Sequence, residues 1–86
     1  MYLFRTFIEV VFEGETYKRE VCLRDAKDSH ICGKVGVAWF NWDVEKFSIP
    51  VVWVRGREVR SMVWRRLAAV LIVEAVKRYN ASAKEA

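Results

Sequence analysis

The apolar residues of this chain change their spacing near Gly56, and this change constrains the fold most strongly. Before Gly56 apolar and polar residues alternate, as in the segment YLFRTFIEVVF at residues 2–12, and such alternation is typical of β-strands. After it, residues 57–80 are rich in alanine, leucine, arginine and glutamate with a helical period. Because 86 residues suffice for one domain, we expect a single α+β domain. Its four-stranded antiparallel β-sheet (residues 2–54) packs on a long C-terminal α-helix (about 57–80), followed by a tail (81–86).

The four expected strands cover residues 2–12, 17–24, 35–42 and 47–54. The tetrad Glu13–Thr16 has the composition of a hairpin turn, and the polar segment 25–34 is expected to be a loop. Pro50 lacks an amide donor, so the fourth strand should lie at a sheet edge or be bulged there. In the first strand, alternation separates Phe4, Ile8, Val10 and Phe12 from Arg5, Phe7, Glu9 and Val11.

The composition excludes several classes of protein. With 53% apolar residues, one proline and four glycines, the chain is neither disordered nor collagen-like. The longest apolar run, Leu67–Val73, is far shorter than the roughly 20 residues that a membrane span requires. The first ten residues lack the cleavage site of a signal peptide. We therefore expect a cytoplasmic protein that makes no membrane contact.

Motifs for catalysis and metal binding are weak. The sequence contains no GxSxG, P-loop or HExxH pattern, and the carboxylates of the first hairpin occupy positions typical of solvated strand and turn residues. Cys22, His30 and Cys32, with Asp28, offer three or four zinc ligands, but their spacing matches none of the standard paired patterns. Cys22 and Cys32 form either a disulfide or, as we favour, two free thiols. We expect no enzymatic activity, no metal and no cofactor.

The positive charge is concentrated in the last third of the chain. The net charge is +4, but residues 1–54 carry seven basic and eight acidic groups, whereas residues 55–86 carry eight basic and three acidic groups. Five arginines, at positions 55, 57, 60, 65 and 66, fall within twelve residues and are opposed only by Glu58. Such a concentration indicates an anionic partner, although a solvated helix face is an alternative.

Arg55, Arg57 and Arg60 lead into the start of the expected helix. The helix macrodipole is positive at this end, so three cations there are locally unfavourable unless an anion binds. They therefore predict phosphate contacts. The alternative is pairing with acidic residues of this chain, namely Asp43, Glu45 or Glu58.

The chain is also rich in aromatic residues, with four tryptophans, three tyrosines and five phenylalanines. Trp39 and Phe40 are neighbours on an expected strand, so one ring must lie on each face of the sheet. Exposed rings beside basic groups suit single-stranded nucleic acid, whose unpaired bases stack while cations follow the backbone. The candidate stacking groups are Phe7, Trp39, Trp42 and Trp53, and the candidate phosphate contacts are Arg5, Lys18, Arg19, Arg55, Arg57 and Arg60. A protein–protein interface would be enriched in the same residue types.

The expected helix is apolar almost all round from Leu67 onward. One sheet covers only one side of a helix, so a second subunit is expected to cover the other. We expect a dimer or tetramer that assembles through Leu67–Tyr79 or through a sheet edge.

Four antiparallel strands followed by one helix resemble the PC4-type single-strand binders. The valine-rich and aromatic-rich sheet, the arginine cluster RGREVRSMVWRR and the absence of glutamine resemble more closely the ThermoDBP-related proteins of hyperthermophilic archaea. That resemblance implies an oligomeric DNA-binding domain that holds single strands. The chain departs from the full-length ThermoDBP pattern because it lacks a long C-terminal coiled-coil extension.

The sequence therefore predicts a homo-oligomeric protein that binds single-stranded DNA or RNA with little sequence specificity. The main alternative is a non-enzymatic interaction or structural factor, such as a small viral protein, that uses the same surface for protein partners. A duplex-DNA regulator that inserts the arginine-rich helix start into a groove is a third hypothesis.

Overall fold

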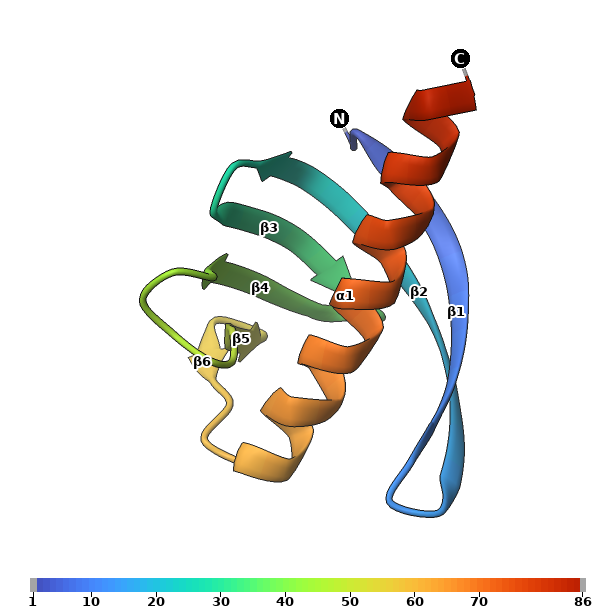
Figure 1. Cartoon of the computed structure of the whole chain (residues 1–86). Helices are drawn as coiled ribbons and strands as arrows, with labels where there is room; N and C mark the ends of the chain where they lie inside the picture. Colours follow the sequence, from blue (N-terminus) through green and yellow to red (C-terminus); the bar gives the residue numbers. More distant parts are fainter. Residues whose placement is uncertain (1, 86) are drawn as a thin grey trace.

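The computed structural model describes the backbone of residues 2–85 and the side chains of residues 2–83. Six strands precede one helix: β1 (Phe4–Phe12), β2 (Glu15–Lys27), β3 (His30–Val35), β4 (Ala38–Asp43), β5 (Val51–Val54), β6 (Arg57–Glu58) and α1 (Met62–Glu85). The strands form one antiparallel sheet in chain order, and α1 crosses one of its faces (Figure 1). This confirms the α+β class and the C-terminal helix, but the prediction of four strands is wrong.

The largest error lies in residues 25–34, which were expected to form a loop. β2 continues to Lys27 and β3 begins at His30, so only a tight turn separates the two strands. Alternation is present, since Ala26 pairs with Ile31 on the face that α1 covers, while most polar residues of the segment point the other way. Only a few residues of this segment are apolar, so the alternation typical of a strand is not visible in the sequence.

Two further element boundaries differ from the predicted ones, because pairs of residues that end in glycine form tight two-residue turns. Glu13 and Gly14 both have positive φ, the backbone of a two-residue hairpin turn, so β2 already begins at Glu15. Arg55 and Gly56 form a second such turn, after which β6 pairs with β5. The helix therefore begins only at Met62. The expected strand at 35–42 is divided by a turn at Gly36 and Val37.

Pro50 lies immediately before β5 and outside the strand. It is buried, and its carbonyl accepts a hydrogen bond from Arg65 Nε at 2.8 Å. β5 itself lies between β4 and β6, so the expectation of an edge or bulged strand at Pro50 is wrong. A proline in this place removes no sheet hydrogen bond.

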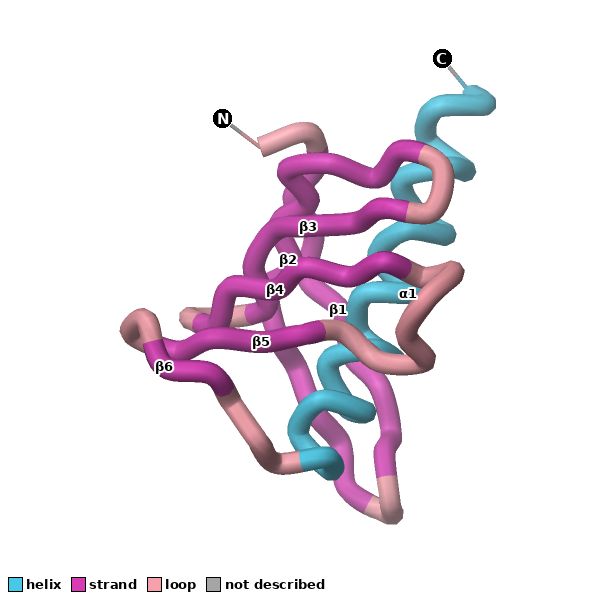
Figure 2. Tube along the Cα trace, turned by 90° about the vertical axis from the view of Figure 1, so that its left-hand side faces the viewer, coloured by secondary structure: helices cyan, strands magenta, loops and turns pink. Residues whose placement is uncertain are grey.

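The core lies between α1 and the face of the sheet that α1 covers, which we call the inner face (Figures 1 and 2). Alternate residues of the strands supply Ile8, Val21, Leu23, Ile31, Val35, Phe40, Trp42 and Val52, and the helix supplies Leu67, Ala68, Leu71, Ile72 and Ala75. The small side chains of Ala68 and Ala75, both without exposed area, allow the helix to approach the sheet closely.

Side chains fix both ends of the helix. Ser61 caps the N-terminus, since its Oγ accepts the amide of Trp64 at 3.3 Å. Near the other end Arg78 donates to the carbonyl of Phe7 at 2.9 Å, and the rings of Phe4 and Tyr79 lie 5.6 Å apart. The helix begins later than the expected residue 57 and continues to Glu85, so the expectation of a tail from residue 81 is wrong for the residues that the structure describes. No helix within residues 2–85 has the length and apolar character needed to cross a membrane.

Candidate nucleic-acid interface

The face of the sheet opposite α1 is covered by no other element among residues 2–85; we call it the outer face (Figure 2). The strand register assigns to it alternate residues that include Arg5, Phe7, Glu9, Lys18, Glu20, Cys22, Cys32, Lys34, Trp39, Asn41, Val51 and Trp53. Alternation along each strand is the reason that this set mixes charged and aromatic side chains, while the inner set is apolar.

Trp39 and Trp53 are direct cross-strand neighbours on the outer face, in β4 and β5. Lys34 lies opposite Trp39 on the other side, and its Nζ is 5.1 Å from the centre of the Trp39 ring. Arg24, at the register shift between Leu23 and Asp25 in β2, places its Cζ 5.6 Å from the same ring. These four residues form the tryptophan cluster. Trp39 remains 40% exposed, so the cluster combines accessible ring surface with two cations.

The β1–β2 hairpin presents a more neutral part of the outer face. Phe7 is 72% exposed, but its basic neighbours are paired with carboxylates. Arg5 lies 3.9 Å from Glu20, and Lys18 lies 4.0 Å from Glu9. Arg5, Phe7 and Lys18 thus share the face with Trp39 and Trp53, but the two cations there are partly neutralised.

Three of the expected site residues lie on the inner side: Trp42, Arg19 and Arg57, the last because it pairs with Val54. Trp42 is only 5% exposed, packs in the core and donates through Nε1 to the carbonyl of Phe47 at 2.8 Å. Its expected role as a stacking group is therefore wrong, because three positions along a strand place Trp39 and Trp42 on opposite faces. Arg19 pairs with Ile8 in the register and so lies on the inner side, opposite in direction to Lys18.

Arg55, Arg57 and Arg60 are all exposed at the end of the sheet that leads into α1. Arg55 occupies the β5–β6 turn with a φ of 52°, and Arg57 pairs with Val54. Neither of the two salt bridges found among residues 2–83 involves these arginines, so they do not pair with Asp43, Glu45 or Glu58. Of the three, Arg55 lies nearest in sequence to Trp53 of the tryptophan cluster, whereas Arg57 pairs with Val54 on the inner side.

Cys22 and Cys32 are free thiols, as favoured over the disulfide. His30 is engaged with Asn41, whose Oδ1 lies 2.6 Å from its Nε2. Within the described part of the chain, no three His, Cys, Asp or Glu side chains are grouped as metal ligands would be. The geometry therefore offers no arrangement for the zinc site that was considered from the sequence.

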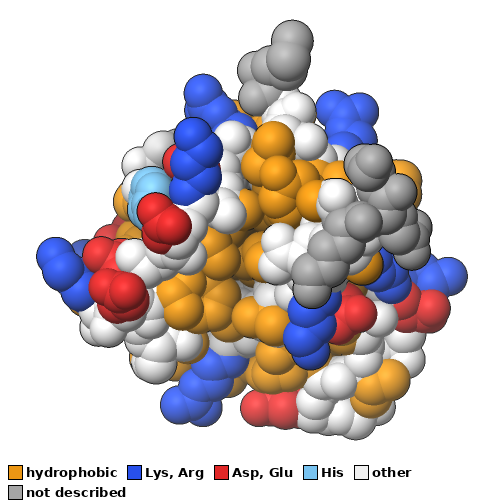
Figure 3. Space-filling view, turned by 45° about the horizontal axis from the view of Figure 1, so that its top comes forward, with side chains coloured by type: hydrophobic (Ala, Val, Ile, Leu, Met, Phe, Trp, Pro, Cys, Tyr) orange, Lys and Arg blue, Asp and Glu red, His pale blue; other side chains and the backbone are white. Residues whose placement is uncertain are grey.

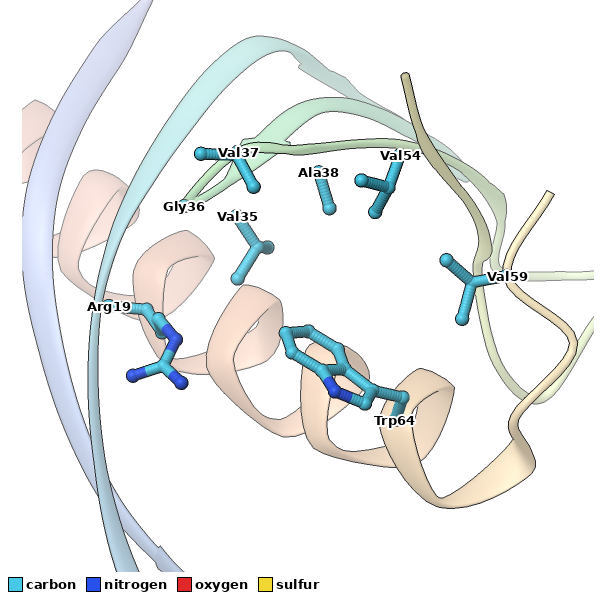
Figure 4. Close-up of a pocket in the computed structure, with 8 residues that line it drawn as sticks. All are labelled: Arg19, Val35, Gly36, Val37, Ala38, Val54, Val59 and Trp64. Atoms are coloured by element: carbon cyan, nitrogen blue, oxygen red, sulfur yellow. The ribbon is translucent and has the colours of Figure 1, made fainter. Parts of the chain in front are cut away.

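One feature that the sequence did not predict is a hollow of about 400 Å³ on the inner side, near the start of the helix. Trp64 and Arg19 approach it from opposite sides, and valines from three segments form its floor (Figure 4). Arg19 and Trp64 are 45 positions apart, so no local spacing could have indicated that they face one another. The position of Trp64 within the arginine run at 55–66 was the available signal in the sequence.

The outward side of α1 is partly apolar. Val63, Val70 and Val73 are each 40% exposed or more, but they alternate with charged residues that include Arg66 and Lys77. A space-filling view shows hydrophobic side chains gathered on one face of the molecule, bordered by basic and acidic groups (Figure 3). The outward side of α1 therefore combines exposed valines with charged residues.

Comparisons with protein-family models, with curated proteins and with solved structures find no match for this chain.

Proposed function

We propose that this protein binds single-stranded DNA or RNA with little sequence preference, by base stacking on the outer face and by phosphate contacts of its basic residues. The observation that carries the proposal is the tryptophan cluster. Two neighbouring indoles lie on an uncovered sheet face, and Lys34 and Arg24 lie within 5.1 and 5.6 Å of one ring centre. Unpaired bases supply the π-faces for such rings, and each stacked base contributes roughly 1–3 kcal/mol.

The arginines beside β5 extend this surface. Arg55 lies in the turn that follows Trp53 and Val54, and it has no carboxylate partner among the described side chains. Arg57 pairs with Val54 and therefore leaves the sheet on the inner side, at the same end of the sheet. A strand whose bases stack on Trp39 and Trp53 would place its next phosphates near this edge. Contacts to phosphates are independent of base identity, which supports low sequence specificity.

The charge of the outer face also sets a limit on the affinity. Glu58 lies directly opposite Trp53, and Glu20 and Glu9 occupy the β1–β2 part. These carboxylates repel phosphates, so a bound strand is expected to follow β3–β5 and the arginine edge in preference to β1. Arg5, Phe7 and Lys18 then make the weaker contacts of the set.

The proposal includes assembly of several copies. Val63, Val70 and Val73 on the outward side of α1 provide apolar surface that a second copy would bury. Association through the helix leaves the outer face free, because the two surfaces lie on opposite sides of the sheet. A dimer would thus carry two tryptophan clusters.

Titration of the full chain with oligo-dT and oligo-U, followed by tryptophan fluorescence, tests the proposal. We expect quenching and an affinity that falls steeply as salt rises, because bound cations are released from the strand. The Trp39→Ala/Trp53→Ala variant should lose most of the affinity. Val11→Ala, which removes an exposed apolar residue of the same face outside the cluster, is the control. Unchanged fluorescence and mobility at low salt would contradict the proposal.

The second candidate function is a protein-interaction factor, which the exposed valines of α1 favour. It predicts a stable oligomer without affinity for single strands, and partner binding that Arg57→Ala and Arg60→Ala leave insensitive to salt. Competition with duplex DNA separates both functions from a duplex-DNA regulator, because only that regulator would prefer the duplex.

A further inference from the structure

The hollow near the start of α1 lies on the opposite side of the sheet from the tryptophan cluster. Val35, Val54 and Val59 line its floor, and Gly36 and Val37 of the β3–β4 turn form part of its rim. Its volume of about 400 Å³ is in the range of small-molecule sites, which is roughly 300–1,000 Å³. The hollow is therefore large enough for one small organic ligand.

The walls of the hollow specify the shape of that ligand. Trp64 is 39% exposed, and its indole projects from the first turn of α1 towards the valine floor (Figure 4). A flat aromatic ring opposite aliphatic side chains leaves a slot that suits a planar apolar body. An aliphatic chain would cover the valines, but it would use the face of the indole less well.

The cations around the hollow indicate the charge of the ligand. Arg19 faces Trp64 from β2, and its only hydrogen bond among the described residues is from Nη1 to the carbonyl of Lys18, at 2.7 Å. Arg57 pairs with Val54 of the floor, so its side chain leaves the sheet on the same side. Among the described side chains, none of those that line the hollow is acidic. The site therefore complements an anion.

We propose that this hollow binds a single nucleotide, with the base against Trp64 and the phosphate at Arg19 and Arg57. A nucleotide combines the two required properties, a planar ring and an anionic group a few bonds away. The ligand is either a free nucleoside monophosphate or the terminal nucleotide of a single strand. The site does not depend on the outer face, so it can exist whether or not the tryptophan cluster binds nucleic acid.

Indole NMR signals of the full chain, with each tryptophan assigned by substitution, provide the test. Adenosine monophosphate should shift the Trp64 signal and leave that of Trp39 in place. Adenosine alone and inorganic phosphate should each bind at least tenfold more weakly, because each lacks one of the two contacts. Trp64→Ala and Arg19→Met should each reduce the affinity at least tenfold. Phe47→Ala, which removes an exposed ring outside both proposed sites, and Arg66→Met are the matched controls.

The source of the ligand follows from a second titration. A shift of Trp64 with the monophosphate assigns the site to free nucleotides, whereas a shift only with a 5′-phosphorylated oligonucleotide assigns it to a strand end. If neither ligand moves the Trp64 signal of the folded, unsubstituted protein, the inference is overturned. Failure of the outer-face proposal would look different, since it would show as strand binding that Trp39→Ala/Trp53→Ala leaves intact.

Discussion

The two faces of this sheet are built from alternate residues of the same strands, yet they differ in almost every property. On the inner face Leu23, Val35 and Phe40 are at most 3% exposed and pack under α1. On the outer face Phe7 and Trp39 are large rings that remain open, next to lysines and arginines. The inner face supplies the stability of the fold. The exposed rings of the outer face bury less surface than the inner residues do, which supports the proposed binding role.

The largest expected effect is on the inner side. Leu71→Ala removes a helix residue without exposed area and leaves a cavity under the sheet, which should lower the free energy of unfolding by about 2–5 kcal/mol. Its neighbour Val70 is 40% exposed, so Val70→Ala should change the stability by less than about 1 kcal/mol. Urea unfolding measures both. Equal losses would show that the outward side of α1 is buried in an assembly.

Gly33 provides the next test, because its backbone lies very close to that of β2 next to the bulge. A Cβ at this position would overlap the backbone carbonyl oxygen of Cys22. Gly33→Ala should therefore force the β2 and β3 backbones apart and destabilise the protein by about 1–3 kcal/mol. Thermal unfolding measures this loss. Cys32→Ala, at the adjacent position on the outer face, should leave the thermal stability almost unchanged. A stable Gly33→Ala protein would contradict the close approach.

Substitution of Trp39 tests whether the outer face serves binding. Trp39→Ala should reduce the affinity for oligo-dT by about 5- to 150-fold, the equivalent of one lost stacking interaction of roughly 1–3 kcal/mol. Its effect on thermal unfolding should be small. A large loss of stability with unchanged affinity would make the tryptophan cluster a structural feature.

Glu58 should have a smaller effect of opposite sign. Glu58→Gln removes a negative charge opposite Trp53 and should strengthen strand binding a few-fold at low salt, since exposed charges interact by about 0.2–1 kcal/mol. The gain should disappear as the salt concentration rises. Glu45→Gln, an exposed acidic position in the β4–β5 loop, is the control.

The smallest expected effect concerns Tyr17 at the end of the first hairpin. Its hydroxyl donates to Glu15 Oε2 at 3.0 Å, and this hydrogen bond to the carboxylate raises the pKa of Tyr17 above its usual 10.0. The raised pKa favours the protonated folded form, so its small contribution to stability is present below pH 10 and is lost as the pH rises through the folded-state pKa. Glu15→Gln should lower the Tyr17 pKa more than Glu13→Gln does, as NMR titration would measure.

The sequence predicted the features that depend on local period. The two faces of β1 and the C-terminal helix follow from the spacing of apolar residues. As expected, the side chains of Phe4 and Ile8 point to one face of the sheet, and those of Arg5 and Phe7 point to the other. The segment 25–34 was missed because only Ala26 and Ile31 mark its inner face, too few apolar residues for alternation to be visible.

The candidate site was predictable only in part, for a related reason. Residue types indicated Trp39 and Trp53, but only the register makes them neighbours and brings Lys34 and Arg24 to one ring. Alternation alone separates Trp39 from Trp42, so the prediction that both stack on bases was inconsistent; which of the two is buried depends on the face that α1 covers. The hollow between Arg19 and Trp64 depends on where a helix crosses a sheet, a distance that no short sequence pattern encodes.

Each strand of the sheet pairs with the next in the chain, and the helix that covers the inner face comes last. During synthesis the meander can therefore form strand by strand while its apolar inner surface still lacks a cover. Until α1 has emerged from the ribosome, this surface is exposed to other nascent chains and is prone to aggregation. The order of elements thus makes the final 24-residue helix the step that protects the newly made protein.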